Sequence, residues 1–386
     1  MADLQDDLDP TAEAGVVEPL PDPAGLLPDP AGLLPEIPEP LPVPHLEGAP
    51  ASAPESRARA LLDAHPVADG YSGLPWTLRE LPWHDFETGD SGLESDIPRL
   101  RAGGVGAQLW SVHVPEVLSG DRAVAETLEQ IDFVQRLVRA HPEGLRLARD
   151  ASEAADARNC GRVATLIGPA RAAALGDSLG TLRALRTLGL CALTLSGTSW
   201  AGPGGLTAFG EEVVREMNRL GVLADLSGAS EATARRALAV SKAPVLFTRS
   251  GARAVREHPV NLPDDLLAAV GGAKGLCLVP LAVEQTGGSV GDVADHLDHV
   301  RRVAGPQCVG LSGTYDTPHP HPEGLADTAG YPRLIAELLE RGWPEADIAL
   351  LTWGNMQRAL READFTARAT RLRRAASTAR REQLDG

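Results

Sequence analysis

Cysteine is scarce in this 386-residue chain, which has four, and no two of them are spaced as Cys-x-x-Cys. Cysteine-based zinc knots and dithiol redox motifs use closely spaced cysteines, so this spacing favours neither. Three of the four, Cys191, Cys277 and Cys308, lie beside or within short apolar runs. We therefore expect buried free thiols and no disulfides, which fits a reducing compartment.

Long apolar segments are also missing. No run of about 18 uninterrupted apolar residues occurs, which is the length that a membrane-spanning helix requires. The first ten residues, MADLQDDLDP, contain neither a basic region nor an apolar stretch of the kind found in secretory signals. These absences predict a cytoplasmic protein with no membrane partner.

Positive charge is in the minority, since 36 Lys and Arg face 53 Asp and Glu for a net charge of −17. Residues 1–54 hold eleven carboxylates and no Lys or Arg, which leaves −6 for the rest of the chain. Without a basic face, nucleic acid is not expected as a partner. The same 54 residues are rich in proline and repeat the unit Leu-Pro-Asp-Pro, and this composition predicts a disordered acidic tail.

Beyond residue 55, short apolar runs alternate with amphipathic segments. The runs have the length of buried strands and number eight: 66–76, 105–114, 162–169, 191–197, 221–228, 243–250, 275–281 and 308–313. Eight such strands separated by helices predict an α/β protein with a parallel (β/α)8 barrel, the TIM barrel. We place this barrel at residues 55–365, followed by an Arg-rich tail at 366–386 that is frayed or draped on the surface.

Several long stretches resemble a known family. They include PVADGYSGLPWTLRE, LRAGGVGAQLWSVHVP, FGEEVVREMNRLGVLADLS and VADHLDHVRRVAG, the last followed by CVGLSGTYD. Over residues 57–386 the chain resembles the membrane dipeptidase (renal dipeptidase) family of zinc peptidases. The resemblance implies a barrel of the metallo-dependent hydrolase type. It also implies two zinc ions at the carboxyl ends of the strands, which acidify the water that attacks the peptide carbonyl.

The positions that the resemblance assigns to zinc ligands carry residues with neither imidazole nor carboxylate: Tyr71, Gly73, Ala170, Gly228, Arg249 and Thr314. A histidine and an arginine that the family uses for substrate align with Gly197 and Val260. Zinc needs imidazole, carboxylate or thiolate donors, and Arg249 adds a fixed positive charge where the cation would lie. We therefore predict no metal cofactor and no catalytic residues. The expected function is a pseudoenzyme that binds a small anionic ligand or a protein partner.

Residues at or after the strand ends are candidates for a ligand pocket: Tyr71, Arg171, Trp200, Asp225, Arg249, Tyr315 and Asp316. Two interpretations stay open. In the simpler one, which the sequence favours, Arg249 pairs with Asp225 or Asp316 and fills the volume of the missing metals. In the other, Arg249 and Arg171 bind a carboxylate or phosphate between apolar walls formed by Trp200 and Tyr315.

Histidines elsewhere do not offer an obvious replacement site. His113 ends the second strand, where we expect its side chain to be packed and hydrogen-bonded rather than a metal ligand. His296 and His299 share a face of an outer helix, while His319 and His321 follow the last strand and are placed for weak metal binding only. The open alternative is a dipeptidase-type zinc hydrolase with a rebuilt site. The expected partners include a second copy of this chain or an active paralogue.

Overall fold

The computed structural model describes residues 53–81, 85–89 and 91–386. The acidic tail predicted for residues 1–54 lies, apart from its last two residues, outside this part of the chain. Described residues form a ten-stranded parallel sheet, with strands in the order β3-β4-β2-β1-β12-β11-β10-β9-β6-β5, and a two-stranded antiparallel sheet of β7 (Ala201–Gly202) and β8 (Gly205–Leu206). The strands of the parallel sheet are β1 (Val67–Ser72), β2 (Val105–Trp110), β3 (Leu145–Ala148), β4 (Val163–Ile167), β5 (Ala170–Arg171), β6 (Ala192–Thr194), β9 (Leu223–Asp225), β10 (Val245–Phe247), β11 (Leu276–Pro280) and β12 (Val309–Ser312).

The sheet curls into a barrel of eight strand positions, as the sequence predicts. Strand β1 pairs with both β2 and β12, and the register continues in parallel around the sheet. Strands β4 and β5 occupy one position, because β5 pairs with β6 and a parallel bridge joins Ile167 to Leu190. Strand β3 is an addition that the sequence analysis missed, and it lies beside β4 outside the eight.

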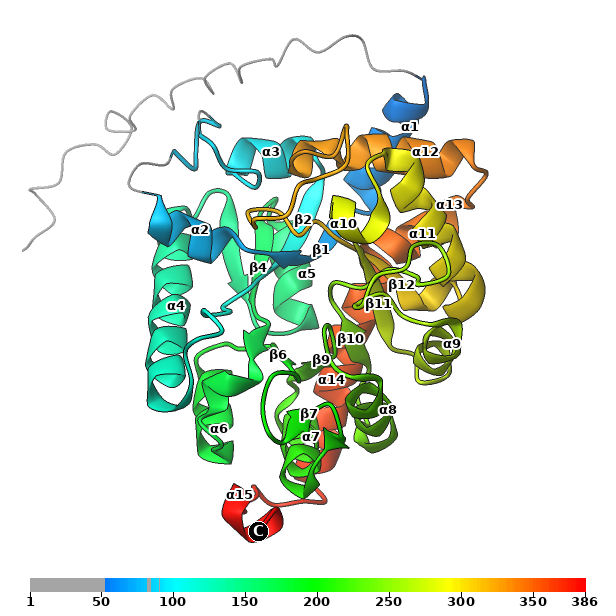
Figure 1. Ribbon diagram of the computed structural model, residues 1–386. Helices are drawn as coiled ribbons and strands as arrows, with labels where there is room; N and C mark the ends of the chain where they lie inside the picture. The colour runs from blue at the N-terminus through cyan, green and yellow to red at the C-terminus, as the bar shows by residue number, and fades with distance from the viewer. Residues whose placement is uncertain (1–52, 82–84, 90) are drawn as a thin grey trace, which may run out of the picture. The chain divides into compact units, whose positions relative to one another are not determined.

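Helices surround the strands (Figure 1). They are α1 (Ala53–Ala64), α2 (Leu74–Glu80), α3 (Ile97–Ala102), α4 (Gly120–Ala140), α5 (Ala151–Asn159), α6 (Leu179–Thr187), α7 (Ala208–Leu220), α8 (Glu231–Val240), α9 (Asp264–Gly272), α10 (Val283–Thr286), α11 (Val290–Ala304), α12 (Tyr331–Glu340), α13 (Glu345–Ala349), α14 (Asn355–Arg371) and α15 (Arg381–Leu384). Local sequence defines their ends. Helix α7, for example, begins after the N-cap Thr207, whose side chain accepts from the Gly210 N–H, and stops at Gly221 with φ of 75°.

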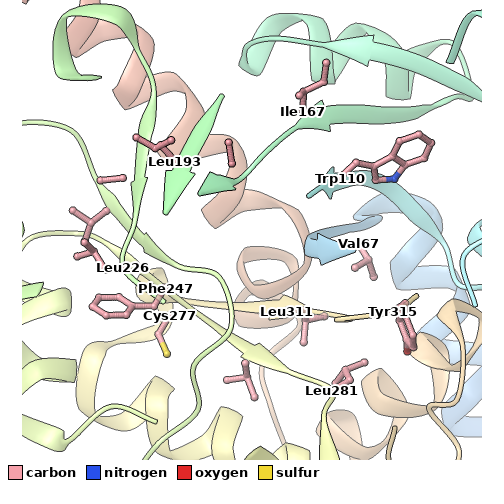
Figure 2. Close-up of a cluster of buried hydrophobic side chains, with 14 of the residues drawn as sticks. Val67, Trp110, Ile167, Leu193, Leu226, Phe247, Cys277, Leu281, Leu311 and Tyr315 are labelled. Carbon is pink, nitrogen blue, oxygen red and sulfur yellow. The ribbon is translucent and has the colours of Figure 1, made fainter. Parts of the chain in front are cut away.

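Two apolar clusters hold the barrel together. The larger lies between strands and helices, and the residues labelled in Figure 2 come from all eight strand positions or the residues just after them. The smaller contains the alternate residues of the same strands, such as Leu246 and Leu278, together with Met356 and Leu360 of α14. Helix α14 crosses behind the strands in Figure 1 and closes the amino-terminal end of the barrel. The carboxyl ends are thereby left for polar residues.

The C-terminal region departs from its predicted boundary. Helix α14 continues through residue 365 to Arg371, so the barrel's last helix includes part of the predicted tail. Residues 372–386, here called the C-terminal strap, lie against α7. Arg374 pairs with Glu212, and the Asp385 carboxylate accepts from the Phe209 N–H at 2.9 Å. The strap is therefore draped on the surface, one of the two predicted states.

The cysteine prediction is confirmed, since all four are free thiols and only Cys160 is exposed. Burial raises the pKa of Cys191 to about 12, so this thiol stays protonated at neutral pH. In the described part of the chain, no helix combines the length and the apolar character needed to cross a bilayer.

Candidate functional site

A cleft of about 780 Å³ opens at the carboxyl ends of the barrel strands. Its walls come from residues at or just after β1, β2, β5, β6, β9 and β10, and from the loops that follow β10, β11 and β12. This is the end of a (β/α)8 barrel where enzymes of this architecture place their chemistry. The volume lies in the range of small-molecule binding sites.

The guanidinium of Arg249 stacks on the ring of Tyr71, with its central carbon 4.3 Å from the ring centroid. Tyr71 lies near the end of β1, and Arg249 follows β10. Within the described residues, no hydrogen bond or ion pair reaches the Arg249 side chain, and its Nε is buried without a partner. A cation–π contact of this kind contributes about 0.5–2 kcal/mol. The cleft therefore holds a positive charge that lacks a carboxylate counterion.

Asp225 does not pair with Arg249, which corrects the ion-pair interpretation. The Asp225 carboxylate is fully buried and accepts from the hydroxyls of Thr194 at 2.6 Å and Ser227 at 2.8 Å. It also accepts from the backbone N–H of Ser227 at 3.1 Å and of Thr248 at 3.0 Å. These local donors satisfy the carboxylate, so it has no need of the guanidinium.

Asp316 is the other predicted partner of Arg249, and it is also engaged elsewhere. Its Oδ1 accepts from the backbone N–H of Glu94 at 2.8 Å, and its own N–H donates to Glu94 Oε2 at 2.5 Å. Both contacts tie the loop after β12 to the segment before α3. Neither of the two carboxylates that were predicted to neutralise Arg249 does so.

His113 joins a chain of hydrogen bonds below the cleft. Its Nε2 lies 3.1 Å from Thr194 Oγ1, and its Nδ1 lies 3.4 Å from the Tyr71 hydroxyl. Because Thr194 donates its proton to Asp225, the histidine donates from Nε2, and Nδ1 is left to accept from Tyr71. Burial lowers the pKa of His113 well below 6.5, and the charges of Arg249 and Arg171 lower it further. The imidazole is therefore neutral at pH 7.

Arg171 brings a second positive charge to the cleft from β5. Its nearest carboxylate is Glu116, at 3.3 Å, and the Glu116 side chain is 91% exposed. Its other contact is a long hydrogen bond of 3.4 Å to the Val114 carbonyl oxygen. An exposed ion pair of this kind contributes about 0–1 kcal/mol, so Arg171 is weakly held.

Three of the seven predicted pocket residues, Tyr71, Arg171 and Arg249, line the cleft. The prediction that Trp200 and Tyr315 form its apolar walls is wrong, since both are fully buried. Trp200 Nε1 donates to Asp177 at 2.8 Å, and the Tyr315 hydroxyl donates to the Leu325 carbonyl at 3.2 Å.

The backbone around Tyr315 explains why it turns inward. Its two neighbours, Thr314 and Asp316, have φ of 54° and 55°, a left-handed conformation that is uncommon for residues other than glycine. Tyr315 still forms a parallel bridge with Ser72 at the end of β1, between these two residues of unusual backbone conformation. Tyr315 packs against Tyr331, with ring centroids 6.0 Å apart, while Thr314 is left at the cleft wall.

The residues at the positions that the resemblance assigns to zinc ligands and substrate groups offer no donor set that fits a pair of zinc ions. Tyr71, Gly228, Arg249 and Thr314 line the cleft, as does Val260, and none is an imidazole or a carboxylate. The other positions, Gly73, Ala170 and Gly197, lie outside the cleft lining. Among the described residues, no group of three or more His, Cys, Asp and Glu side chains is placed to hold a metal.

Gly73 shows that the backbone as well as the side chains departs from a metal site. A Cβ added at Gly73 would lie 2.3 Å from the carbonyl oxygen of Asp316, so no side chain fits there without movement of the main chain. The Gly73 N–H also donates to the Tyr315 carbonyl at 2.8 Å. The β12 loop thus occupies the space of a ligand side chain at this position.

The structure adds cleft residues that the sequence analysis did not select: His258, Glu284 and Gln285. The only sequence signal for them is their position in the segments that connect a barrel strand to the next large helix, where Glu284 and Gln285 lie in the short helix α10. His319 also lines the cleft and pairs with Glu284, whereas His321 is directed to the Leu281 carbonyl at 2.5 Å and to Glu94 at 3.1 Å. These two imidazoles therefore do not converge on one site.

Histidines of the outer helix ring are structural, as predicted. His296 Nδ1 accepts from the Ala252 N–H at 2.9 Å, and His299 Nε2 lies 2.7 Å from Asp264 Oδ1. Both contacts join α11 to neighbouring segments. Neither imidazole lines the cleft.

The fold and the position of the cleft define a (β/α)8 barrel of the metallo-dependent hydrolase type. The model of one family, described as membrane dipeptidase (Peptidase family M19), matches residues 55–374, and the chain belongs to this family. It is 38% identical to mouse Dipeptidase 3 over 333 residues, which are 80% of this chain and 66% of the mouse protein. The chain thus spans about two thirds of that relative's length.

Solved structures agree on the fold. The dipeptidase AC, a metallopeptidase of the same family, is 25% identical with a TM-score of 0.71, over 77% of this chain and 98% of the other. A metallopeptidase from Rhodobacter sphaeroides, solved with a phosphinate mimic of the dipeptide L-Ala-D-Ala, also has a TM-score of 0.71. It is 24% identical and covers 77% of this chain and 99% of its own.

Proposed function

We propose that this protein is a non-catalytic member of the membrane dipeptidase family, a pseudoenzyme whose cleft binds a small anionic ligand. One observation carries the proposal. The Arg249 guanidinium lies on the ring of Tyr71 and has no carboxylate partner among the described residues, at a position that the resemblance assigns to a zinc ligand. A fixed positive charge there repels a divalent cation and attracts an anion.

The hydrogen bonds around Arg249 support binding rather than hydrolysis. Peptide hydrolysis by this family's chemistry needs a water acidified by zinc, and the cleft residues do not fit that metal pair. His113 lines the cleft with Arg249, and its two ring nitrogens already face Tyr71 and Thr194. It is therefore not free to act as a general base toward a ligand.

Zinc content and dipeptide turnover test this proposal on one sample. Protein expressed in zinc-supplemented medium is analysed for metal and assayed with an L-dipeptide, beside an active family member prepared in parallel. We expect zinc well below one ion per chain and no hydrolysis above the buffer rate. Stoichiometric zinc, with turnover that a chelator abolishes, would overturn the proposal. It would instead favour a hydrolase with a rebuilt site near His113, Glu284 and His319.

A further inference from the structure

We propose that the anion bound in the cleft is a doubly charged tetrahedral oxyanion of the phosphate-monoester class, held between Arg249 and Arg171. This inference rests on the proposed function, because it specifies the ligand of the same cleft. Three features of the cleft carry it: the two arginine charges, the free hydrogen-bond donors and the volume.

Neither arginine of the cleft is held by a close, buried carboxylate. Arg249 has no ion pair among the described residues, and Arg171 has only its contact with the exposed side chain of Glu116. The other carboxylate in the wall, Glu284, contacts His319, and no ion pair of Glu284 with Arg249 or Arg171 is found in the described part of the chain. A dianion neutralises both guanidinium groups, whereas a single carboxylate leaves one of them unbalanced.

Both guanidinium groups lie close enough to act on one side chain. The charges of Arg249 and Arg171 each lower the pKa of His113, after the larger effect of burial. All three side chains line the same cleft. A ligand beside His113 is thus within the field of both arginines, and the neutral imidazole adds no charge of its own.

The free hydrogen-bond donors of the cleft come from residues on or just after three different strands. The two oxygens of a carboxylate lie in one plane, while a phosphate monoester presents three charged or polar oxygens in a tetrahedral array. Besides the two arginines, the Ser196 hydroxyl lines the cleft, and no hydrogen bond from it to another described residue is found. Hydroxyl and guanidinium groups that line one cleft from β5 and from the residues after β6 and β10 suit a tetrahedral ion.

The cleft is larger than an inorganic ion requires. Its volume of about 780 Å³ leaves room for an organic group on the ester oxygen. Apolar side chains that line the same cleft, Val114, Pro115, Val260 and Pro318, offer a surface for that group. These features point to an ester of phosphate rather than the free ion as the natural ligand.

Anion titrations of the full chain test the proposal, with inorganic phosphate, sulfate and acetate as probes at constant ionic strength. We expect phosphate and sulfate to bind and acetate to bind at least tenfold more weakly. Between pH 6 and pH 8, phosphate affinity should rise as the ion takes its second charge, while sulfate affinity stays constant. Sulfate reports any titration of protein groups near the site, which include His113, His258, His319, Glu116, Glu284 and Tyr71.

Substitutions locate the binding. Arg249→Met and Arg171→Met should each weaken phosphate binding about tenfold or more, the usual effect of losing a charge-assisted hydrogen bond. Arg249→Lys, which keeps a positive charge, should retain part of the affinity. Arg136→Met is the matched control, because Arg136 also stacks on an aromatic ring, that of Phe133 at 5.8 Å, but lies on the exposed face of α4.

The outcomes separate this inference from the proposed function. If acetate binds as tightly as phosphate and Arg249→Met abolishes both, the dianion is wrong while the anion-binding pseudoenzyme stands. If Arg136→Met weakens phosphate as much as Arg249→Met does, binding is a general ionic effect and the inference falls. Should Arg249→Met fail to fold by circular dichroism, Arg249→Lys and Arg171→Met decide the question by the same titration.

Discussion

At the scale of single residues, burial decides the charge of groups beside the cleft. Asp316 is the clearest case, because burial raises its pKa from 3.8 to about 7 and the nearby Glu94 carboxylate adds to the rise. The folded protein therefore keeps a proton on Asp316 at pH values where the unfolded chain has lost it. Stability from this group is full below about pH 4 and is lost as pH rises toward 7, by an amount on the order of 2–4 kcal/mol.

Replacing Asp316 with asparagine should remove that dependence. The neutral amide keeps an oxygen to accept from the Glu94 N–H and carries no charge at any pH. We expect the stability of Asp316→Asn, relative to the wild type, to increase by about 2 kcal/mol or more between pH 5 and pH 8 in urea unfolding. Asp132→Asn, at an exposed carboxylate of α4, is the control and should show no such change. If the free energy of unfolding varies with pH in Asp316→Asn as it does in the wild type, ionisation of Asp316 does not destabilise the folded protein.

At the scale of elements, the C-terminal strap is part of the barrel's surface rather than a loose end. It is held at one end by Arg374, which pairs with Glu212, and at the other by Asp385, which caps the start of α7. The Glu212 side chain is only 10% exposed. A buried carboxylate whose partner is removed loses stability, so the pair matters more than a surface ion pair does.

Substituting Arg374 tests the strap. Arg374→Ala should lower the free energy of unfolding by about 1–3 kcal/mol, because Glu212 loses its closest cation and keeps the Ser377 hydroxyl and Arg215 at 3.6 Å. Amide exchange in α7 should accelerate in the same variant. Arg373→Ala is the matched control. Arg373 is adjacent to Arg374 in the sequence, but no ion pair of Arg373 is found in the described residues. Equal stability of the two variants would show that the strap does not hold α7.

At the scale of the whole molecule, buried neutral histidines make the stability of the fold depend on pH. Burial lowers the pKa of His296 to about 4, and it also lowers that of His113. The unfolded chain takes up these protons near pH 6.5, whereas the folded chain does not until the pH is much lower. Stability from both groups is therefore full above about pH 7 and is lost as pH falls toward 4. For His296 alone the loss is about 2–3 kcal/mol.

Substitution of His296 should reduce the loss of stability that accompanies a fall in pH. His296→Asn keeps an acceptor for the Ala252 N–H but cannot be protonated. We expect it to be less stable than the wild type at pH 7, because the smaller side chain packs poorly, yet to lose less stability between pH 7 and pH 5. His65→Asn, at an exposed histidine, should leave the slope unchanged. If His296→Asn loses as much stability between pH 7 and pH 5 as the wild type does, the role given to this imidazole is contradicted.

The barrel and the family are within reach of the sequence because both depend on local patterns. Apolar runs at strand length and amphipathic segments between them recur along the chain. The apolar pattern of each segment predicts its secondary structure and its buried face without information on the segments that pack against it. Strand β3 was missed because its pattern is irregular, with Arg146 in the middle of only four residues. The extent of α14 was missed because its end, near Arg371, carries no glycine or proline to stop the helix.

The sequence by itself determined the eight strand positions, the free cysteines and the membership in the membrane dipeptidase family. It also identified Tyr71, Arg171 and Arg249 as residues of the strand ends. Only the tertiary structure decided which strand-end side chains meet in the cleft, because their direction depends on backbone angles such as the positive φ of Thr314. It also decided that Arg249 stacks on Tyr71, since donors from three neighbouring segments already satisfy Asp225.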